Sequence, residues 1–122
     1  MKLHLTKAEG KQLIKSYRAG AITINYAIFN ASLIITPDEV IEDWQVTDFN
    51  QLNNAHFAKI ATLKPELVLL GTGSEHRFVH PKLVNALTEI NISVECMTTD
   101  AACRTYNILM SEGRFVVAGL II

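Results

Sequence analysis

Hydrophobic and polar positions alternate with period two near the start of the chain. Residues 21–26 follow this pattern, which is typical of a half-buried strand. A turn is expected at residues 29–31, and residues 32–36 fit a second strand that ends at Pro37 and Asp38. The two strands are therefore predicted to pair as an antiparallel hairpin.

The middle of the chain changes to helical spacing. Asp48 can cap a helix, and Gln51, three residues later, completes a capping box. The apolar face of this helix is formed by Leu52, His56, Phe57, Ile60, Ala61 and Leu63. Pro65 marks the end of the helix. Before it, residues 42–46 fit a short strand, and residues 11–17 fit either a strand or a helix.

Strands and helices alternate in the second half. Strands are predicted at residues 67–70, 92–97 and 115–121, and the first is apolar throughout, as a strand covered on both faces is. One helix begins at Pro81 and runs to about Ile90. The next is capped by Thr99 or Asp100 and ends before Gly113.

The spacing of these three strands has a consequence for function. Strands separated by helices of this length are most economically parallel, with right-handed crossovers. Loops that leave their C-terminal ends then lie at one edge of the sheet, where such sheets bind ligands. These loops are residues 71–80 and 98–100. The turns at residues 71–73 and 98–107 are therefore predicted to open on the same edge.

Composition narrows the class of protein. The 122 residues form one domain, 49% hydrophobic and 19% charged, with a net charge of -1. This balance argues against nucleic-acid binding, which needs a surplus of Lys and Arg. The first residues contain no apolar stretch long enough for a signal peptide, and no segment approaches the roughly 20 apolar residues that a membrane span needs, so neither is expected. A cytoplasmic location is expected, with Cys96 and Cys103 as free thiols.

The first candidate for chemistry is the turn formed by Gly71, Thr72 and Gly73. Two glycines after a buried strand can expose backbone N–H groups to an anion. The same residues equally fit a tight strand exit packed on a neighbouring element. His76 stands where a dinucleotide fingerprint requires glycine, and a P-loop sequence is absent. No cofactor is therefore predicted.

The second candidate is Cys103, in the first turn of the last predicted helix. The helix dipole and Arg104 favour a thiolate there, which could act as a nucleophile or redox sensor. No histidine lies near it in sequence, and His76 or His80 could reach it only if the two loops meet. Packing in the core is the commoner role for such a cysteine. No catalytic residue is assigned.

Charged residues complete the candidate set. Arg77 and Arg104 could bind a carboxylate or phosphate, or be solvated or paired with nearby carboxylates. His76 and His80 are separated by a segment that Pro81 keeps out of a helix, so no metal site is predicted. The candidate ligand-binding or partner-binding residues are Gly71, Thr72, Gly73, Arg77, Cys103, Arg104, Thr105 and Asn107.

These motifs together resemble a known family. The segments LLGTG at residues 69–73, VECMTT at 94–99, ACRTYNIL at 102–109 and EGR at 112–114 are similar to the Mth938-like family. The resemblance implies an α/β, three-layer fold with a central mixed sheet, an N-terminal β-hairpin and a C-terminal βαβαβ unit. A mitochondrial member is an assembly factor for respiratory complex I. This chain looks like the bacterial members, which have no established reaction.

Two hypotheses about function follow. The leading one is a non-enzymatic protein-interaction or assembly module, because the chain has no nucleophile–base pair, metal cluster or cofactor fingerprint. The rival is a small-molecule or anion-binding protein, with an enzyme as one form of it, that has a concave pocket joining the 71–73 and 98–107 turns. A homodimer through the exposed edge of the hairpin is left open.

Overall fold

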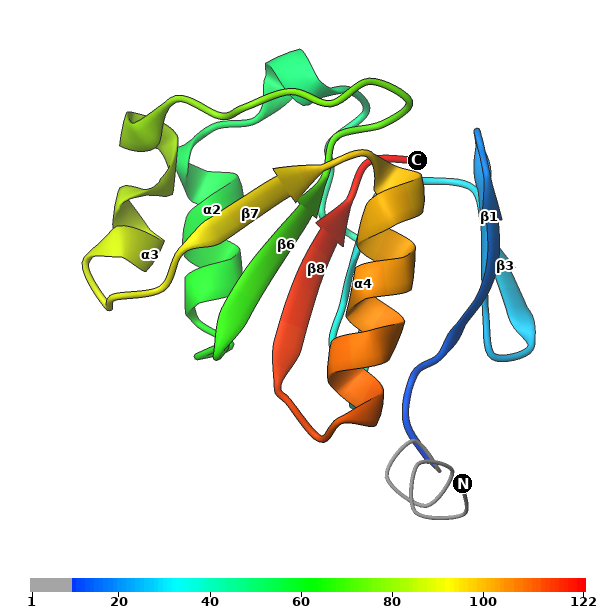
Figure 1. The fold of residues 1–122 in the computed structure, drawn as a ribbon. Coiled ribbons are helices and arrows are strands. Elements are labelled where there is room, and N and C mark those ends of the chain that lie inside the picture. The colour runs from blue at the N-terminus through cyan, green and yellow to red at the C-terminus, as the bar shows by residue number, and fades with distance from the viewer. Residues whose placement is uncertain (1–9) are drawn as a thin grey trace.

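The computed structural model describes residues 10–122 as two sheets and several helices (Figure 1). Three antiparallel strands form a small sheet in the order β1 (Ile14–Arg18), β2 (Ala21–Ile24) and β3 (Ala27–Phe29). A five-stranded sheet has the order β5-β4-β8-β6-β7. Its strands are β4 (Leu33–Ile35), β5 (Val40–Ile41), β6 (Leu67–Gly71), β7 (Val94–Met97) and β8 (Val116–Leu120).

Helices cover both faces of the five-stranded sheet. The longest, α4 (Thr99–Ser111), lies between this sheet and the small sheet (Figure 1). The opposite face is covered by α2 (Asn54–Ala61) and α3 (Asn85–Thr88), with the 3-10 turns η1 (Phe49–Gln51) and η2 (Pro81–Val84). The predicted three-layer α/β architecture with a central mixed sheet is therefore confirmed.

Two clusters of buried side chains fill the spaces between these layers. On the α4 side, Ile22 and Ile24 of the small sheet join Tyr106 of α4 and Leu69 of β6. On the other side, Phe57 and Ile60 of α2 pack with Val68 and Leu70 of β6. Because β6 contributes side chains to both clusters, its sequence is apolar without alternation, as predicted.

The carboxyl ends of three strands lie at one edge. β6 runs parallel to both β7 and β8, with Leu70 opposite Cys96 on one side and Gly119 on the other. β4 runs antiparallel to β8, which makes the sheet mixed. The predicted parallel arrangement of the second half of the chain is confirmed.

The predicted pairing of residues 21–26 with residues 32–36 is wrong. β2 instead pairs with β3 around a two-residue turn, in which Ile24 stands opposite Ala27 and Asn25 has a φ of 52°. Asparagine tolerates this left-handed backbone better than most residues. β4 is buried at all three positions and pairs with β8, because an apolar segment without alternation belongs in the covered sheet.

The structure decides one prediction that was left open and contradicts another. Residues 11–17, which fit either a strand or a helix, contain most of β1. Residues 42–46 form no strand, because Gln45 has a φ of 62°, which breaks an extended ladder. Trp44 is buried against β8, where a Cβ on Gly119 would lie 2.6 Å from its ring.

The helix caps also differ in detail. Asp48 caps η1 by accepting from the Asn50 N–H, and the α2 helix begins later. Asn53 caps α2, and His56 completes the capping box by accepting from the Asn53 N–H at 3.0 Å. His56 is half-buried and hydrogen-bonded, as expected for a structural histidine. The cap of α4 is Thr98, one residue before the predicted position.

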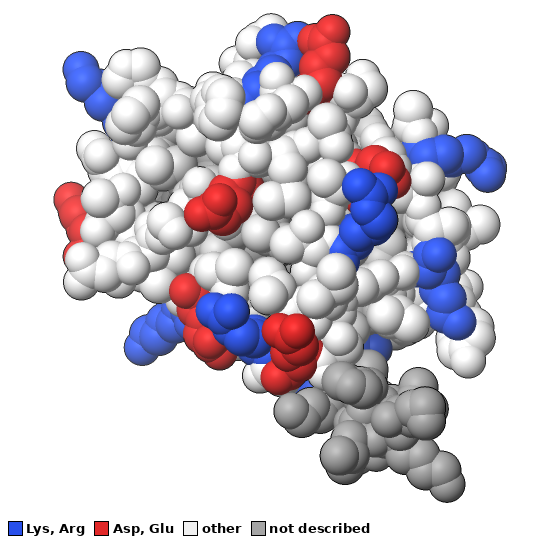
Figure 2. All heavy atoms as spheres, in the orientation of Figure 1, with Lys and Arg blue, Asp and Glu red and all other residues white. Residues whose placement is uncertain are grey.

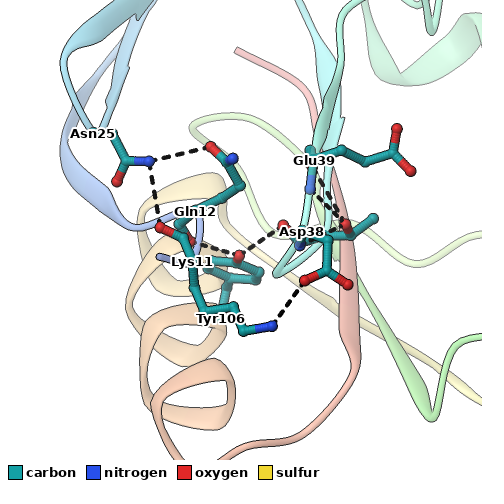
Figure 3. Close-up of polar contacts among 7 residues, drawn as sticks. Lys11, Gln12, Asn25, Asp38, Glu39 and Tyr106 are labelled. Carbon is teal, nitrogen blue, oxygen red and sulfur yellow. Dashed lines mark hydrogen bonds and ion pairs between the residues drawn. The ribbon is translucent and has the colours of Figure 1, made fainter. Parts of the chain in front are cut away.

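Polar contacts attach the small sheet to the rest of the chain (Figure 3). The Tyr106 hydroxyl donates to the Gln12 carbonyl at 2.7 Å and lies 3.1 Å from the Thr36 carbonyl. Lys11 pairs with Asp38 at 2.8 Å beside this contact. One buried phenol therefore connects α4, the segment that precedes β1 and the residue that follows β4.

Candidate functional site

The two candidate turns meet at the carboxyl edge of the sheet. The Gly73 N–H donates to the Thr99 hydroxyl at 2.8 Å, and the Thr99 N–H donates to the Gly73 carbonyl at 2.9 Å. The Thr72 N–H also donates to the Met97 carbonyl at 2.9 Å. The turns are therefore neighbours, as the sequence predicted, and they are joined directly.

Thr99 is the centre of this junction. It is fully buried, and its hydroxyl donates to the Ile121 carbonyl at 2.6 Å while accepting from Gly73. One side chain thus connects the residues that follow β6, β7 and β8. The sequence showed Thr99 only as a candidate cap, since a threonine after a strand does not reveal which distant carbonyl it will reach.

Steric constraints explain why positions 71 and 73 of the turn are glycine. A Cβ on Gly71 would lie 2.9 Å from the Thr99 hydroxyl oxygen and 3.0 Å from the Thr99 Cα. Gly73 has a φ of 97°, which side-chain-bearing residues rarely adopt. Because the Gly73 N–H is already bound by Thr99, the turn does not offer that group to an anion.

Thr72 is also used inside the turn. Its side chain is buried, and its hydroxyl lies 2.5 Å from the Glu75 carbonyl. The same oxygen accepts from the Arg77 N–H at 3.3 Å. Thr72 therefore shapes the segment from 72 to 77.

Cys103 lies in the core beneath the small sheet. Burial, with a smaller contribution from the Asp100 charge, raises the pKa of its thiol to about 12. The thiol is protonated at neutral pH, so the helix dipole does not produce the reactive thiolate considered from the sequence. The His76 Nε2 atom lies 3.0 Å from the Cys96 carbonyl, so the His76 ring is hydrogen-bonded to β7 and does not act as a base for Cys103.

The remaining candidates on α4 point in different directions. Arg104 is exposed and pairs with Asp100 one turn earlier. Thr105 is half-buried. Asn107 faces the small sheet, where its amide donates to the Ile14 carbonyl at 2.7 Å and accepts from the Ile14 N–H at 3.0 Å. These side chains do not form one site with the 71–73 turn.

A shallow cavity of about 280 Å³ does lie at the carboxyl edge. It is lined by Thr47, Asp48, Phe49, Asn50, Thr72, Gly73, Ser74, Glu75, Arg77, Ile121 and Ile122. The predicted pocket was to join the 71–73 turn to the start of the last helix. That prediction is wrong, because hydrogen bonds to Thr99 close that gap and the cavity opens toward residues 47–50 instead.

The cavity is lined by one paired arginine and has a net negative lining. The Arg77 guanidinium lies 5.6 Å from the centre of the Phe49 ring and pairs with Glu75 at 3.0 Å. One positive charge on Arg77 and two negative charges on Asp48 and Glu75 sum to -1. This lining disfavours a small anion, because the arginine is already neutralised.

Phe78 directly follows the cavity-lining residue Arg77 in the sequence. Phe78 is 77% exposed, and its ring centre lies 4.5 Å from that of the exposed His76. The sequence did not single out Phe78, since nothing in a local pattern shows that a phenylalanine in a loop faces solvent. Large exposed aromatic groups are typical of contact surfaces.

The surface charges and the positions of potential metal ligands indicate no further site in the described residues. On the face shown in Figure 2, basic and acidic side chains are interspersed with wide uncharged areas. Within residues 10–122, no three histidine, cysteine or acidic side chains gather as metal ligands. Over that same part of the chain, no helix is long and apolar enough to cross a bilayer.

Comparison with known proteins adds a family. Residues 14–121 match the family described as "Protein of unknown function (DUF498/DUF598)". A "13 kDa major membrane protein" of Francisella tularensis subsp. holarctica is 30% identical over 117 residues, covering 95% of each chain. The "NADH dehydrogenase [ubiquinone] 1 alpha subcomplex assembly factor 3" of Mus musculus is 32% identical over 110 residues.

The extent of these matches differs. The match covers 88% of this chain but 59% of the mouse assembly factor, so the chain spans little more than half of that protein. Among solved structures, a Bordetella pertussis protein described as a Mth938-like domain has a TM-score of 0.81 and 28% identity. That match covers 94% of this chain and 86% of the other, which confirms the fold implied by the sequence resemblance.

Proposed function

The chain belongs to the DUF498/DUF598 family of proteins of unknown function, and we propose that it is a non-enzymatic protein-interaction module. The carboxyl edge of its five-stranded sheet is the docking surface in this proposal. The expected cytoplasmic location stays a prediction, as does the bacterial type of the chain.

One observation carries the proposal: the edge binds its own polar groups and exposes an aromatic one. The Gly73 N–H and the Thr99 hydroxyl are used within the junction, and the Cys103 thiol is buried and protonated. Catalysis needs a nucleophile or base that can reach a substrate. Phe78, in contrast, is open to solvent.

The surroundings of Phe78 fit a contact surface. Arg77 pairs with Glu75 at the surface, and its guanidinium lies over the Phe49 ring, so a charged and an aromatic group stand together near Phe78 in the chain. Aromatic residues and arginine are enriched at the energetic centres of protein interfaces. The adjacent cavity, with its two carboxylates, would accept a basic or amide side chain of the partner.

The relationship to the assembly factor supports the same class of function. An assembly factor acts on other protein chains, and the matched region covers most of this chain. Small-molecule binding in the same cavity is the weaker hypothesis, because the cavity is shallow and its lining has no unpaired positive charge.

Differential capture tests the proposal. Immobilised wild-type protein and the variants Phe78→Ala, Arg77→Ala and Ile108→Ala are exposed to extract of the cell of origin, and bound proteins are quantified. Ile108 is the matched control, because it is an exposed apolar residue on α4, outside the edge. We expect a protein retained by the wild type and by Ile108→Ala to fall about tenfold with Phe78→Ala.

Two results would contradict this function. Equal capture by the edge variants and the wild type would remove the edge from the interaction. Absence of any stable partner from the native extract would remove the interaction itself.

A further inference from the structure

The outer strands of the two sheets differ in how their edges are covered. Asn107 binds the N–H and carbonyl of Ile14 on β1. His76 lies against the Cys96 carbonyl of β7. Unpaired edges pair readily with another strand, so such coverage has a protective role.

Among the described residues, nothing pairs with the outer edge of β3. Ile24 and Ala27 flank the two-residue turn and form its hydrogen-bonded pair, so the next pair, Thr23 with Ile28, is not hydrogen-bonded. The N–H and carbonyl of Ile28 therefore point away from β2. Within residues 10–122, no group outside the small sheet forms a hydrogen bond to them.

Apolar side chains accompany this open edge. Ile28 is 68% exposed, and Tyr26 is 98% exposed. A cavity of about 330 Å³ lies at the C-terminal end of β3 and is lined by Ile28, Phe29, Asn30, Ala31 and Glu42. This end of the edge is therefore not filled by other side chains of the described residues.

Opposite charges lie near the two ends of β3, although Lys15 itself belongs to β1 on the other side of β2. The Lys15 ammonium lies 5.6 Å from the centre of the Tyr26 ring at one end. Glu42 lines the cavity with Asn30 at the other end. Neither side chain forms an ion pair with another residue of the described part of the chain.

We propose that a second copy of this chain binds at the β3 edge, antiparallel and centred on Ile28. In this register, position 26 of each copy stands opposite position 30 of the other. A twofold axis then brings Lys15 of each copy toward Glu42 of the other, twice in one contact. In an antiparallel twofold contact, both Lys15 side chains and both Glu42 side chains find a partner of opposite charge. This pairing favours a second copy over an unrelated strand.

The contact involves a short strand and is small, so the dimer is weak and depends on concentration. This surface is separate from the edge that carries Phe78, and the inference goes beyond the proposed function. Either can fail without the other.

Sedimentation equilibrium of the full chain, from about 1 µM to about 1 mM, tests the dimer. The wild type is expected to associate reversibly within this range. Ile28→Lys is expected to abolish association, because it places two like charges at the centre of the contact. Ile108→Lys is the control, since Ile108 is 57% exposed on α4, and it should associate like the wild type.

Charge exchange tests the arrangement and does not depend on the Ile28 variant. Lys15→Glu and Glu42→Lys should each weaken association about fivefold, because each creates two repulsive pairs. The double variant should return to within about twofold of the wild type.

A chain that stays monomeric throughout this range would overturn the proposal. So would an Ile28→Lys variant that dimerises normally, or a double charge exchange that fails to restore association. Phe78→Ala in the same assay should leave association unchanged, which separates this result from the capture experiment.

Discussion

At the scale of single residues, most candidates from the sequence have structural roles. Gly71 allows Thr99 to approach, and the Thr99 hydroxyl joins Gly73 to Ile121. Cys103 lies in the core rather than at a surface. Side chains that are satisfied by neighbours in this way are poor candidates for chemistry, because a ligand would have to displace those contacts.

The Cys103 thiol gives a prediction about pH. Its folded-state pKa of about 12 lies above the unfolded value of about 9, so the unfolded chain loses this proton first as pH rises. The free energy of unfolding is therefore expected to fall between these values, by about 1 kcal/mol per pH unit. Urea unfolding from pH 8 to pH 10.5 should show a steeper fall for the wild type than for Cys103→Ala.

Equal slopes for the two proteins would show that folding does not raise the pKa of Cys103. The comparison between proteins is needed because tyrosine and lysine side chains titrate over the same range, and both proteins share them.

At the scale of elements, side chains rather than a strand ladder attach the small sheet to α4. Asn107 binds both backbone groups of Ile14, and the Tyr106 hydroxyl donates to the Gln12 carbonyl just before β1. The sequence named Asn107 as a candidate binding residue within the 98–107 turn. It could not indicate that the partner of Asn107 is a backbone 93 residues away.

Removal of this clamp gives a second prediction. Asn107→Leu keeps the approximate size of the side chain but leaves the N–H and carbonyl of Ile14 without partners. We expect a loss of about 2 kcal/mol in the free energy of unfolding. Hydrogen exchange should accelerate more at the Ile14 amide than at the Leu69 amide in the central sheet. Equal acceleration at both amides would mean that Asn107 has no local role.

At the scale of the whole molecule, both sheets share one core across α4. The cluster that contains Ile22 and Ile24 of the small sheet also contains Tyr106 and residues of the central sheet. The Tyr106 hydroxyl adds polar contacts to both sides of this interface (Figure 3). The described part of the chain should therefore unfold in one cooperative step.

Tyr106→Phe tests this cooperativity. The change removes one buried hydroxyl and is expected to cost about 1 kcal/mol, shifting the far-UV circular dichroism and Trp44 fluorescence transitions together. Trp44 is a useful probe because it lies in the other core cluster. Tyr26→Phe is the matched control and should change stability by less than about 0.5 kcal/mol, since Tyr26 is fully open to solvent. Two separate transitions would contradict a shared core.

The sequence by itself determined the alternation of strands and helices in the second half and the shared edge of residues 71–73 and 98–100. Hydrophobic periodicity and the lengths of the connections between strands are visible in the sequence, so these features can be predicted without the fold. The two glycines of the 71–73 turn were also visible as a sharp strand exit, one of the two interpretations that the sequence left open.

Only the tertiary structure decided which strands pair in the first half and which side chains remain available. β4 pairs with β8 and not with residues 21–26, because its three buried positions require cover on both faces of the sheet. Thr99, Asn107 and Phe78 acquired their surroundings from segments far away in the chain. Pairing and exposure depend on these distant contacts, which no local pattern encodes. The shared edge therefore became a closed junction beside an exposed aromatic residue.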